Sequence, residues 1–522
     1  MKTLALILGA LVALGTAAFS QLTSNDVATI IAQAATRASV VSTDSVIAVV
    51  DREGYVLGVW SVNGSVPPNG LIAEAIARAG TAAFLSTDKN AFTTRTALTL
   101  VQQHFPPIRN RHGVLVGVRN KPTGPLVGLT FSSLPFSDVN RYKNPANFVP
   151  GMGGGTNGAP VPTPPLGSLD GFPGGVPLYR NGTNALGGVG VAGGPDTLNQ
   201  FQADINENVA LAGQIGFAPA NRILGSHVLI AGIRLPYIHG EPPKVPIVAP
   251  LGSIGTIVPG FPVTNSPTVS YPTLVLGGVT GEVRNAIVDD PLGNLSSTDV
   301  TNILTLAAQR CELTRAAIRL PRGQSARMVI TVVSNPASNG VSPAILGTFR
   351  MLDSTMFSWD ICVQKARTVI FFSSALATNF LPAGLPAEHA YSARAIGFLA
   401  EQFYPPGIDG KPAGPLLGAQ EFFSGFPAGV TNPLNGAVLA TSPGIDPNLP
   451  NGMTLFPGAF PLYRNGVLIG AVSVSGDGVD QDDFVAIAGT VGFEPPANLR
   501  SDQIIFRGTR LPYAKFPRNP LL

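Results

Sequence analysis

An internal repeat constrains this chain more than any other feature of its sequence. The segments FPGGVPLYRNG at 172–182 and FPGAFPLYRNG at 456–466 are nearly the same. In each, an Asn-Gly pair lies between apolar runs, which is the signal for a tight β-hairpin turn. The returning strands are expected over 186–192 and 467–475. A chain that repeats a hairpin in this way is expected to build the same sheet twice.

Other landmarks recur in the same order in the two halves of the chain. They are a capped helix start (LTSNDV, LSSTDV), a strand pair, a helix of small and apolar residues (ARAGTAAF, QKARTVIF), a GPLVG or GPLLG motif and a closing RLPY. Each repeat exceeds 200 residues, enough to bury its own core, which favours two tandem domains over a two-unit solenoid. We predict copy 1 at 21–237 and copy 2 at 294–522. The Pro-, Gly- and Val-rich residues 238–293 are then a linker, or alternatively a strand-bearing connection.

The N-terminus has the pattern of a secretory signal. A lysine at position 2 precedes an apolar stretch at 4–19, and small residues precede Gln21. The stretch is shorter than the ~20 apolar residues of a spanning helix, so a single membrane anchor is the weaker alternative and no stable membrane span is expected. We expect a cleaved signal peptide at 1–20 and a secreted or periplasmic protein.

Charge and composition narrow the class of partner. Charged residues make up 12% of the chain, against roughly 25% in soluble proteins, and the net charge is only +3. The sequence contains no basic run, so nucleic acid is not expected as a partner. The 60 glycines and 48 prolines, beside 45% hydrophobic residues, predict folded domains with long Pro/Gly-rich loop insertions at 106–169 and 405–455.

The repeated motifs carry a family resemblance. PLYRNG followed by LGGVGVAGG at 186–194, the corresponding IGAVSVSG at 469–476, and the VVDREG hairpin at 49–54 resemble the HbpS/GlcG-like haem-binding (haem-degrading) domain family over about half of each copy. The resemblance implies an α/β (α+β) sandwich of profilin-like type, with an antiparallel sheet flanked by helices. It also implies oligomers, so the fused copies would form an intramolecular pseudo-dimer, with a larger homo-oligomer left open. One departure is Ser334, which replaces Asp51 in copy 2.

Haem, the cofactor that the resemblance implies, needs an axial donor in an apolar pocket. The chain offers five histidines, none of which recurs between the copies: His104, His112, His227, His239 and His389. A symmetric pair of His-ligated sites is therefore not expected, and His104 is our candidate for a single metal ligand.

Tyrosine and arginine, by contrast, recur in the hairpin. Tyr179 and Tyr463 are candidate haem contacts, and Arg180 and Arg464 are candidate partners for a propionate. The alternative, which the position beside a turn favours, is that the tyrosines pack and bind backbone.

Other motifs indicate structure rather than chemistry. Cys311 and Cys362 are the only cysteines, and we weigh a disulfide between them against two buried free thiols. The Gly-rich strand at 187–194 lies in a hairpin, so its small residues are expected to let a helix approach the sheet rather than to cradle a phosphate. We find no catalytic motif in the sequence.

The leading functional hypothesis is an exported haem-binding protein used in haem capture, storage or sensing. One alternative is a non-catalytic extracytoplasmic structural or interaction protein that has lost ligand binding. A second alternative is a haem-degrading enzyme, which would require a recurrent polar cluster in a pocket.

Overall fold

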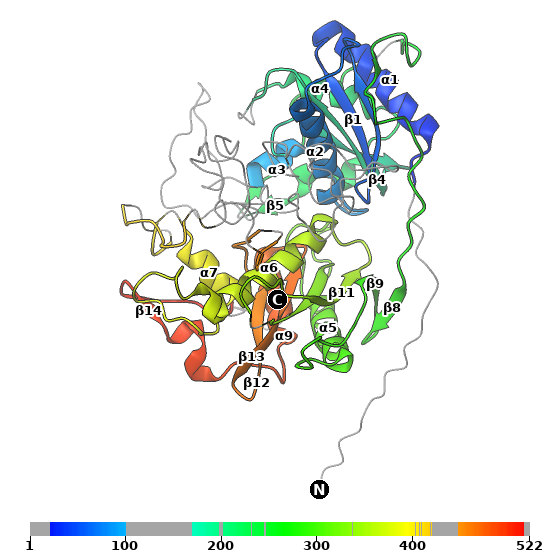
Figure 1. Ribbon diagram of the computed structural model, residues 1–522. Coiled ribbons are helices and arrows are strands. Elements are labelled where there is room, and N and C mark those ends of the chain that lie inside the picture. The colour runs from blue at the N-terminus through cyan, green and yellow to red at the C-terminus, as the bar shows by residue number, and fades with distance from the viewer. Residues whose placement is uncertain are drawn as a thin grey trace.

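The computed structural model describes residues 21–100 and 170–515, apart from 198–201, 231, 245–246, 337, 402, 407, 409, 418, 420–446 and 451. The N-terminal stretch, His104, His112 and most of the two expected loop insertions lie outside the described residues. Each half of the chain forms its own antiparallel sheet, and the two sheets lie in separate halves of the molecule (Figure 1).

The first sheet has the strand order β3-β4-β1-β2-β7. Its strands are β1 (Val46–Asp51), β2 (Val56–Ser61), β3 (Gly175–Arg180), β4 (Asn184–Ala192) and β7 (Thr256–Ile257). All neighbouring strands in it are antiparallel. The Asn-Gly turn joins β3 to β4, as the hairpin motif predicts, and both turn residues take the positive φ that such a turn needs.

The second sheet has the order β12-β13-β10-β11-β9-β8 and is again antiparallel. Its strands are β8 (Thr273–Leu276), β9 (Val279–Asn285), β10 (Val329–Ser334), β11 (Ile345–Met351), β12 (Ala459–Arg464) and β13 (Val467–Ser475). Four strands thus repeat in the same order. The register irregularities repeat too, between Leu178 and Tyr179 in one copy and between Leu462 and Tyr463 in the other. The repeat seen in sequence is therefore a repeat of structure.

Helices cover both faces of each sheet. In copy 1, α1 (Ser24–Val41) and α4 (Ile205–Gly213) pack on one face, while α2 (Asn69–Leu85) and α3 (Thr94–Leu100) lie on the other. The corresponding pairs in copy 2 are α5 (Ser297–Glu312) with α9 (Val479–Ala488), and α6 (Phe357–Ser373) with α7 (Ala393–Leu399). The predicted class, an antiparallel sheet flanked by helices, is confirmed. None of the helices in the described part of the chain is both long and apolar enough to cross a bilayer.

Short elements close each copy. Copy 1 has 3₁₀ turns at Asn221–Ile223 and Gly225–His227 and a hairpin of β5 (Leu229–Ile230) and β6 (Ile233–Arg234). Copy 2 has 3₁₀ turns at Ala375–Ala377, Ala497–Leu499 and Ser501–Gln503 and a hairpin of β14 (Ile505–Phe506) and β15 (Thr509–Arg510). The RLPY motif begins at the last residue of each hairpin, Arg234 or Arg510, so the closing landmark of the sequence is the end of a matching structural unit.

Residues 238–293 contribute strands to both sheets. The strand β7 pairs with β2 at the edge of the first sheet, and β9 pairs with β11 at the corresponding edge of the second. This pairing satisfies backbone donors and acceptors that β2 and β11 would otherwise expose, and β7 and β8 become the edge strands. The segment is thus strand-bearing, and the copies are joined by a connection that belongs partly to each sheet.

Glycine in β4 lets α2 approach the first sheet closely. A Cβ atom on Gly188 would lie 2.2 Å from the Ala79 carbonyl oxygen, and one on Gly190 would lie 2.2 Å from that of Ala75. Both distances are far below van der Waals contact, so only glycine fits. The Gly-rich run therefore serves packing, as the sequence suggested, and not a phosphate.

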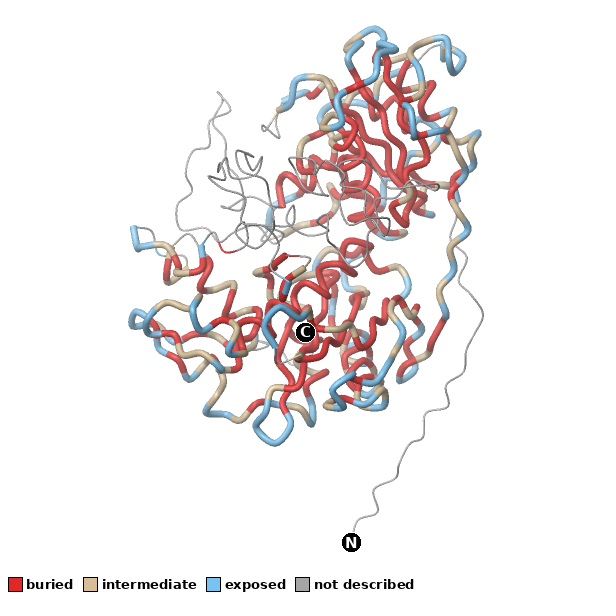
Figure 2. The backbone as a smooth tube through the Cα atoms, in the orientation of Figure 1, coloured by how far each residue is buried: buried red, intermediate tan, exposed pale blue. Residues whose placement is uncertain are grey.

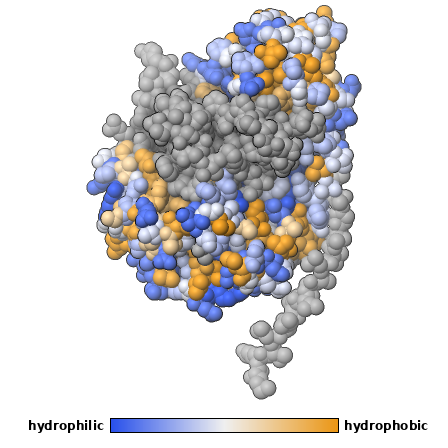
Figure 3. All heavy atoms as spheres, in the orientation of Figure 1, coloured by the Kyte–Doolittle hydropathy of each residue, from blue (hydrophilic) through white to orange (hydrophobic). Residues whose placement is uncertain are grey.

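Buried residues are concentrated within both copies (Figure 2). They form several hydrophobic clusters, one of which contains residues of both copies. On the face shown in Figure 3, hydrophobic and hydrophilic residues of the described part are interspersed. Such a surface agrees with the low content of charged residues.

Candidate functional site

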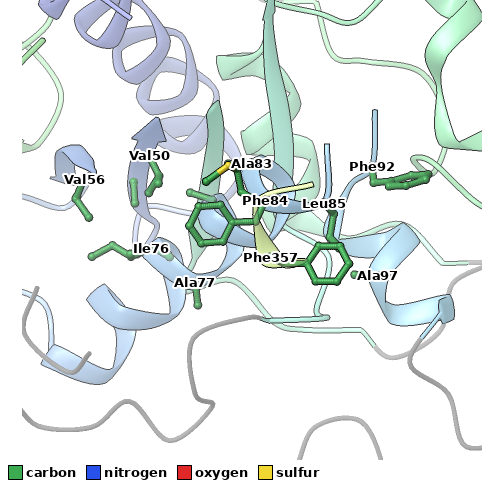
Figure 4. Packing of buried hydrophobic residues seen from close by; sticks show 14 of the residues in the cluster. Val50, Val56, Ile76, Ala77, Ala83, Phe84, Leu85, Phe92, Ala97 and Phe357 are labelled. Atoms are coloured by element: carbon green, nitrogen blue, oxygen red, sulfur yellow. The ribbon is translucent and has the colours of Figure 1, made fainter. Parts of the chain in front are cut away.

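The two copies meet through the faces that carry α2 and α6. One hydrophobic cluster includes Ile76, Phe84, Leu85 and Phe92 of copy 1 together with Met356, Phe357, Ile361 and Cys362 of copy 2. The Met356 N–H donates to the Phe84 carbonyl oxygen at 3.1 Å. Phe357 lies beside Phe84 and Leu85 in Figure 4. Apolar side chains of both copies are thus removed from water together, which favours their association.

Ion pairs reinforce this junction at its margin. Arg52, at the end of β1, contacts Asp88 at 3.2 Å and Asp353 of copy 2 at 3.1 Å. Asp353 also binds Arg319 at 2.6 Å. Burial favours the neutral acid, but the two guanidinium groups outweigh it, and the pKa of Asp353 lies below its usual value. Asp353 is therefore held as a carboxylate between the copies.

A second ion pair joins the turn after β1 to β9. Glu53 accepts hydrogen bonds from Arg284 at 2.7 and 3.0 Å, and the guanidinium lies 3.7 Å from the centre of the Tyr271 ring. Burial opposes ionisation of Glu53, yet Arg284 keeps the pKa of this carboxyl below its ordinary value. Both side chains are buried, so the pair is a fixed cross-link.

Asp51 stabilises its own hairpin. Its Oδ1 accepts hydrogen bonds from the backbone N–H groups of Glu53 and Tyr55, both at 2.9 Å. Burial is the main cause that raises its pKa to about 7. In copy 2, the Ser334 hydroxyl accepts from the Ala344 N–H at 3.0 Å. The replacement of Asp51 by Ser334 thus preserves a turn-closing acceptor without a charge.

The recurrent tyrosines of the hairpin are buried in the protein interior. The Tyr179 hydroxyl lies 2.8 Å from the carbonyl oxygens of both Thr87 and Asn90, to which it can donate. The Tyr463 hydroxyl is buried without a hydrogen-bond partner among the described residues. Burial raises the pKa of both phenols, which opposes the phenolate that an iron ligand requires. For Tyr179, these contacts favour the packing interpretation.

Arg180 and Arg464 form equivalent ion pairs in the two copies. Arg180 binds Asp26 at 2.9 Å, and Arg464 binds Asp299 at 3.0 Å. Each aspartate belongs to the capping box that begins α1 or α5. The arginines therefore tether a helix N-terminus to the hairpin, and their repetition has a structural reason.

The two thiols are free in the structure. Cys311, on α5, donates to the Ala326 carbonyl oxygen, and Cys362, on α6, donates to that of Val329. They belong to different hydrophobic clusters, one on each face of the second sheet. The proposed disulfide is therefore corrected to two buried free thiols, because the sheet lies between the helices that carry them.

Three histidines lie in the described part of the chain. His227 contacts Asn221 at 3.4 Å, and His389 contacts the Ala387 carbonyl oxygen at 3.0 Å. His239 is exposed and lines a cleft beside α4. The structure leaves the prediction for His104 without a test.

Sequence reasoning missed a set of buried cations that does recur. Arg78 on α2 and Lys365 on α6, paired in the aligned helices, donate to the carbonyl oxygens of Val191 and Val474 at 2.8 and 2.9 Å. They also bind Asp170 at 3.0 Å and Asp482 at 2.8 Å, respectively. The signal was present in the alignment of ARAGTAAF with QKARTVIF, where a basic residue stands at the same position.

A second kind of ion pair also recurs: it joins α3 to α4 in copy 1 and α7 to α9 in copy 2. Arg95 binds both carboxylate oxygens of Glu207, at 2.8 and 2.9 Å. In copy 2, Arg394 binds Asp483 and Asp480. These pairs join helices across the end of each sheet, and the residues at 480–483 thus serve ion pairing as well as the helix N-terminus.

A small cavity lies between the copies. It is lined by apolar residues of both copies and by one ion pair: Leu85, Phe92, Leu100, Ile230, Ile318, Phe357, Phe456, Lys365 and Asp482, with Ser475, Gly476, Gly478 and Val479. Its volume of about 30 Å³ holds about two water molecules. Asp482 Oδ1 has no hydrogen-bond partner among the residues that the structure describes, and burial raises the pKa of this acid to about 7 despite Lys365.

The cavity can hold water or a proton, but not a tetrapyrrole. It is far below the roughly 300–1,000 Å³ of ordinary ligand pockets. The described residues that line it include none of His, Tyr, Met and Cys, the usual axial donors to haem iron. The described residues of this cavity therefore do not fit haem.

A larger cleft lies on the outer side of copy 1. It has a volume of about 400 Å³ and is lined by Arg37 and Val41 of α1, by residues 203–205, 207, 208 and 211 at and in α4, and by His239. The helices α1 and α4 lie side by side in Figure 1. This cleft joins an apolar wall to a histidine and an arginine, the combination that the inner cavity lacks.

Comparison with known proteins places one part of the chain in a family. Residues 306–490, about a third of the chain, match the family model described as haem degrading protein HbpS-like. No curated protein sequence matches.

Solved structures give weak similarities. The PduOC–haem complex is 18% identical, with 38% of this chain and 95% of that chain covered and a TM-score of 0.23. The Klebsiella pneumoniae protein ORFY is 17% identical, with coverages of 37% and 86% and a TM-score of 0.21. A double mutant of Streptomyces reticuli HbpS is 14% identical, with 40% and 90% covered and a TM-score of 0.21. At such scores the family assignment rests on the sequence model, and by that model residues 306–490 form a domain of the HbpS-like family.

Proposed function

We propose that this chain is an exported haem-binding protein of the HbpS-like family, in which two copies of the domain form an intramolecular pseudo-dimer. The family match at 306–490 is the observation that carries the proposal. The same strand order in copy 1 supports the extension of the family to residues 21–237. The apolar cluster and ion pairs between α2 and α6 support the pseudo-dimer. The N-terminal signal pattern supports export and a secreted or periplasmic location.

The proposal is tested by a haemin titration of the chain from Gln21 onward. Haem capture, storage and sensing all require a saturable shift of the Soret band with a defined stoichiometry. An increase in absorbance without saturation would contradict haem binding. Loss of the Soret band after ascorbate is added in air, with release of iron, would assign the chain to the haem-degrading alternative.

The structural or interaction protein is the second candidate. It is favoured by one set of observations: Arg180 and Arg464 tether helix N-termini, the Tyr179 hydroxyl binds backbone carbonyls, and the cavity between the copies is too small for haem. A chain without saturable haemin binding would support it.

A further inference from the structure

The cleft beside α4 differs from the inner cavity in size and in chemistry. Its volume of about 400 Å³ lies in the range of ligand pockets, roughly 300–1,000 Å³. Val41, Ile205 and Leu211 supply an apolar wall. Such a wall suits a flat aromatic ligand whose polar groups lie at its edge.

His239 is held at this cleft by its backbone. Its N–H donates to Glu207 Oε2 at 3.1 Å, and Glu207 is in turn bound through both oxygens by buried Arg95. Its ring forms no hydrogen bond with any residue that the structure describes. The backbone is thus anchored to a buried ion pair, and a ring nitrogen keeps its lone pair available to a metal.

Copy 2 offers a natural comparison at the same position. There, two residues after the RLPY tyrosine, Lys515 takes the place of His239, and its N–H donates to Asp483 at 3.1 Å. The Lys515 ammonium group binds Asp480 at 3.0 Å. A protonated lysine has no lone pair, so an iron ligand at this position exists in copy 1 alone.

Arg37, on α1, supplies a cation to the same cleft. Its Nε donates to Asn208 Oδ1 at 2.7 Å, which orients the guanidinium. Its two terminal nitrogens have no hydrogen-bond partner in the described part of the chain, so they can bind a carboxylate in the bidentate manner of arginine.

The carboxylates that line the cleft are already engaged. Glu207 is paired with Arg95, and Asp204 caps α4 by accepting from the Glu207 N–H at 3.0 Å. Asp204 also accepts from the Thr197 N–H at 3.2 Å. Arg37 is therefore the charged group of the cleft that is left to meet an anionic ligand.

We infer that this cleft is the haem site of the chain, with His239 as the iron ligand and Arg37 as the partner of a propionate. The inference rests on the proposed function and adds its location, its donor and its stoichiometry of one haem per chain. When bound, haem would supply the iron, and the protein would supply the His239 imidazole, an apolar wall and one cation.

The test compares the chain from Gln21 with His239→Ala, and with His227→Ala as a control on another histidine of copy 1, which is partly buried and contacts Asn221. We expect His239→Ala to weaken haemin binding by about tenfold or more and to change the absorption spectrum of the bound haemin, because a metal ligand is lost. His227→Ala should bind like the parent. Arg37→Gln should weaken binding and leave the ligand spectrum unchanged. Equal melting temperatures will show that the variants are folded.

The outcomes separate the inference from the proposed function. If the parent binds haemin and His239→Ala binds it with the same affinity and spectrum, the site is elsewhere and the inference is overturned, while the proposed function stands. If the parent does not bind haemin, both are overturned. A stoichiometry of two haems per chain would also contradict a site confined to copy 1.

Discussion

Replacing Arg284 by methionine tests whether the buried ion pair between Arg284 and Glu53 of copy 1 stabilises the association of the two copies. Arg284 is fully buried, binds Glu53 of copy 1 at 2.7 Å and Glu282 at 2.5 Å, and lies over the rings of Tyr271 and Trp359. The variant leaves two buried carboxylates without this cation. Removal of one partner from a buried ion pair costs about 3–5 kcal/mol of the free energy of unfolding. For a urea slope of about 3 kcal/mol per molar, the midpoint should fall by about 1 M or more.

The assay is urea unfolding followed by tryptophan fluorescence and far-ultraviolet circular dichroism. Trp60 lies in copy 1 and Trp359 in copy 2, so the fluorescence reports on both. The matched control is Arg327→Met, because Arg327 pairs with Glu312 at the surface, where such a pair contributes about 0–1 kcal/mol. A loss below about 1 kcal/mol for Arg284→Met, or equal losses for both variants, would refute the reasoning.

Three further predictions concern single residues. Asp51 has a folded-state pKa of about 7, above its ordinary value of 3.8, so its ionisation lowers the stability of the fold as the pH rises from about 4 to 7. Asp51→Asn should remove the part of the decline in melting temperature that this ionisation causes over that range. A pH profile of melting temperature that the substitution leaves unchanged would contradict the prediction. Gly190→Ala should lower the free energy of unfolding by about 1–3 kcal/mol, because the added Cβ would lie 2.2 Å from the Ala75 carbonyl oxygen. The control Gly70→Ala has open space around the added Cβ and should be neutral or slightly stabilising. Thermal unfolding of both variants measures the difference. Cys311 and Cys362 should both be alkylated in denaturant without a reductant, and neither in the native state; a mass that shows labelling only after reduction would restore the disulfide.

The fold could be predicted from the sequence because its signals are local. An Asn-Gly turn between apolar runs specifies a hairpin, and Ser, Thr and Asn residues before an apolar-periodic run indicate a helix start. Both signals occur twice in the same order, so the antiparallel sheet and its flanking helices could be predicted for each copy. The expected caps, Ser24 or Asn25 and Ser297 or Thr298, were wrong by one or two residues, because the structure has Thr23 and Ser296 as the N-caps. The pairing of residues 238–293 with strands of both sheets could not be predicted, because β-pairing between distant segments leaves no mark in local composition.

The candidate site was less accessible to such reasoning. Tyr179 and Arg180 recur in the sequence, but one sits in the interior against backbone carbonyls and the other binds a helix cap. Recurrence marked what both copies need in order to fold. A site confined to one copy, as proposed around His239, leaves no recurrent signal.

The sequence by itself determined that one α/β unit occurs twice, and where each unit has its turns and helix starts. Only the tertiary structure decided which face of each unit meets the other, that Cys311 and Cys362 are separated by a sheet, and that Arg37 and His239 line one cleft. The reason is physical: turn and cap preferences depend on neighbouring residues, whereas burial, ion pairing and the walls of a cleft depend on residues brought together from distant parts of the chain.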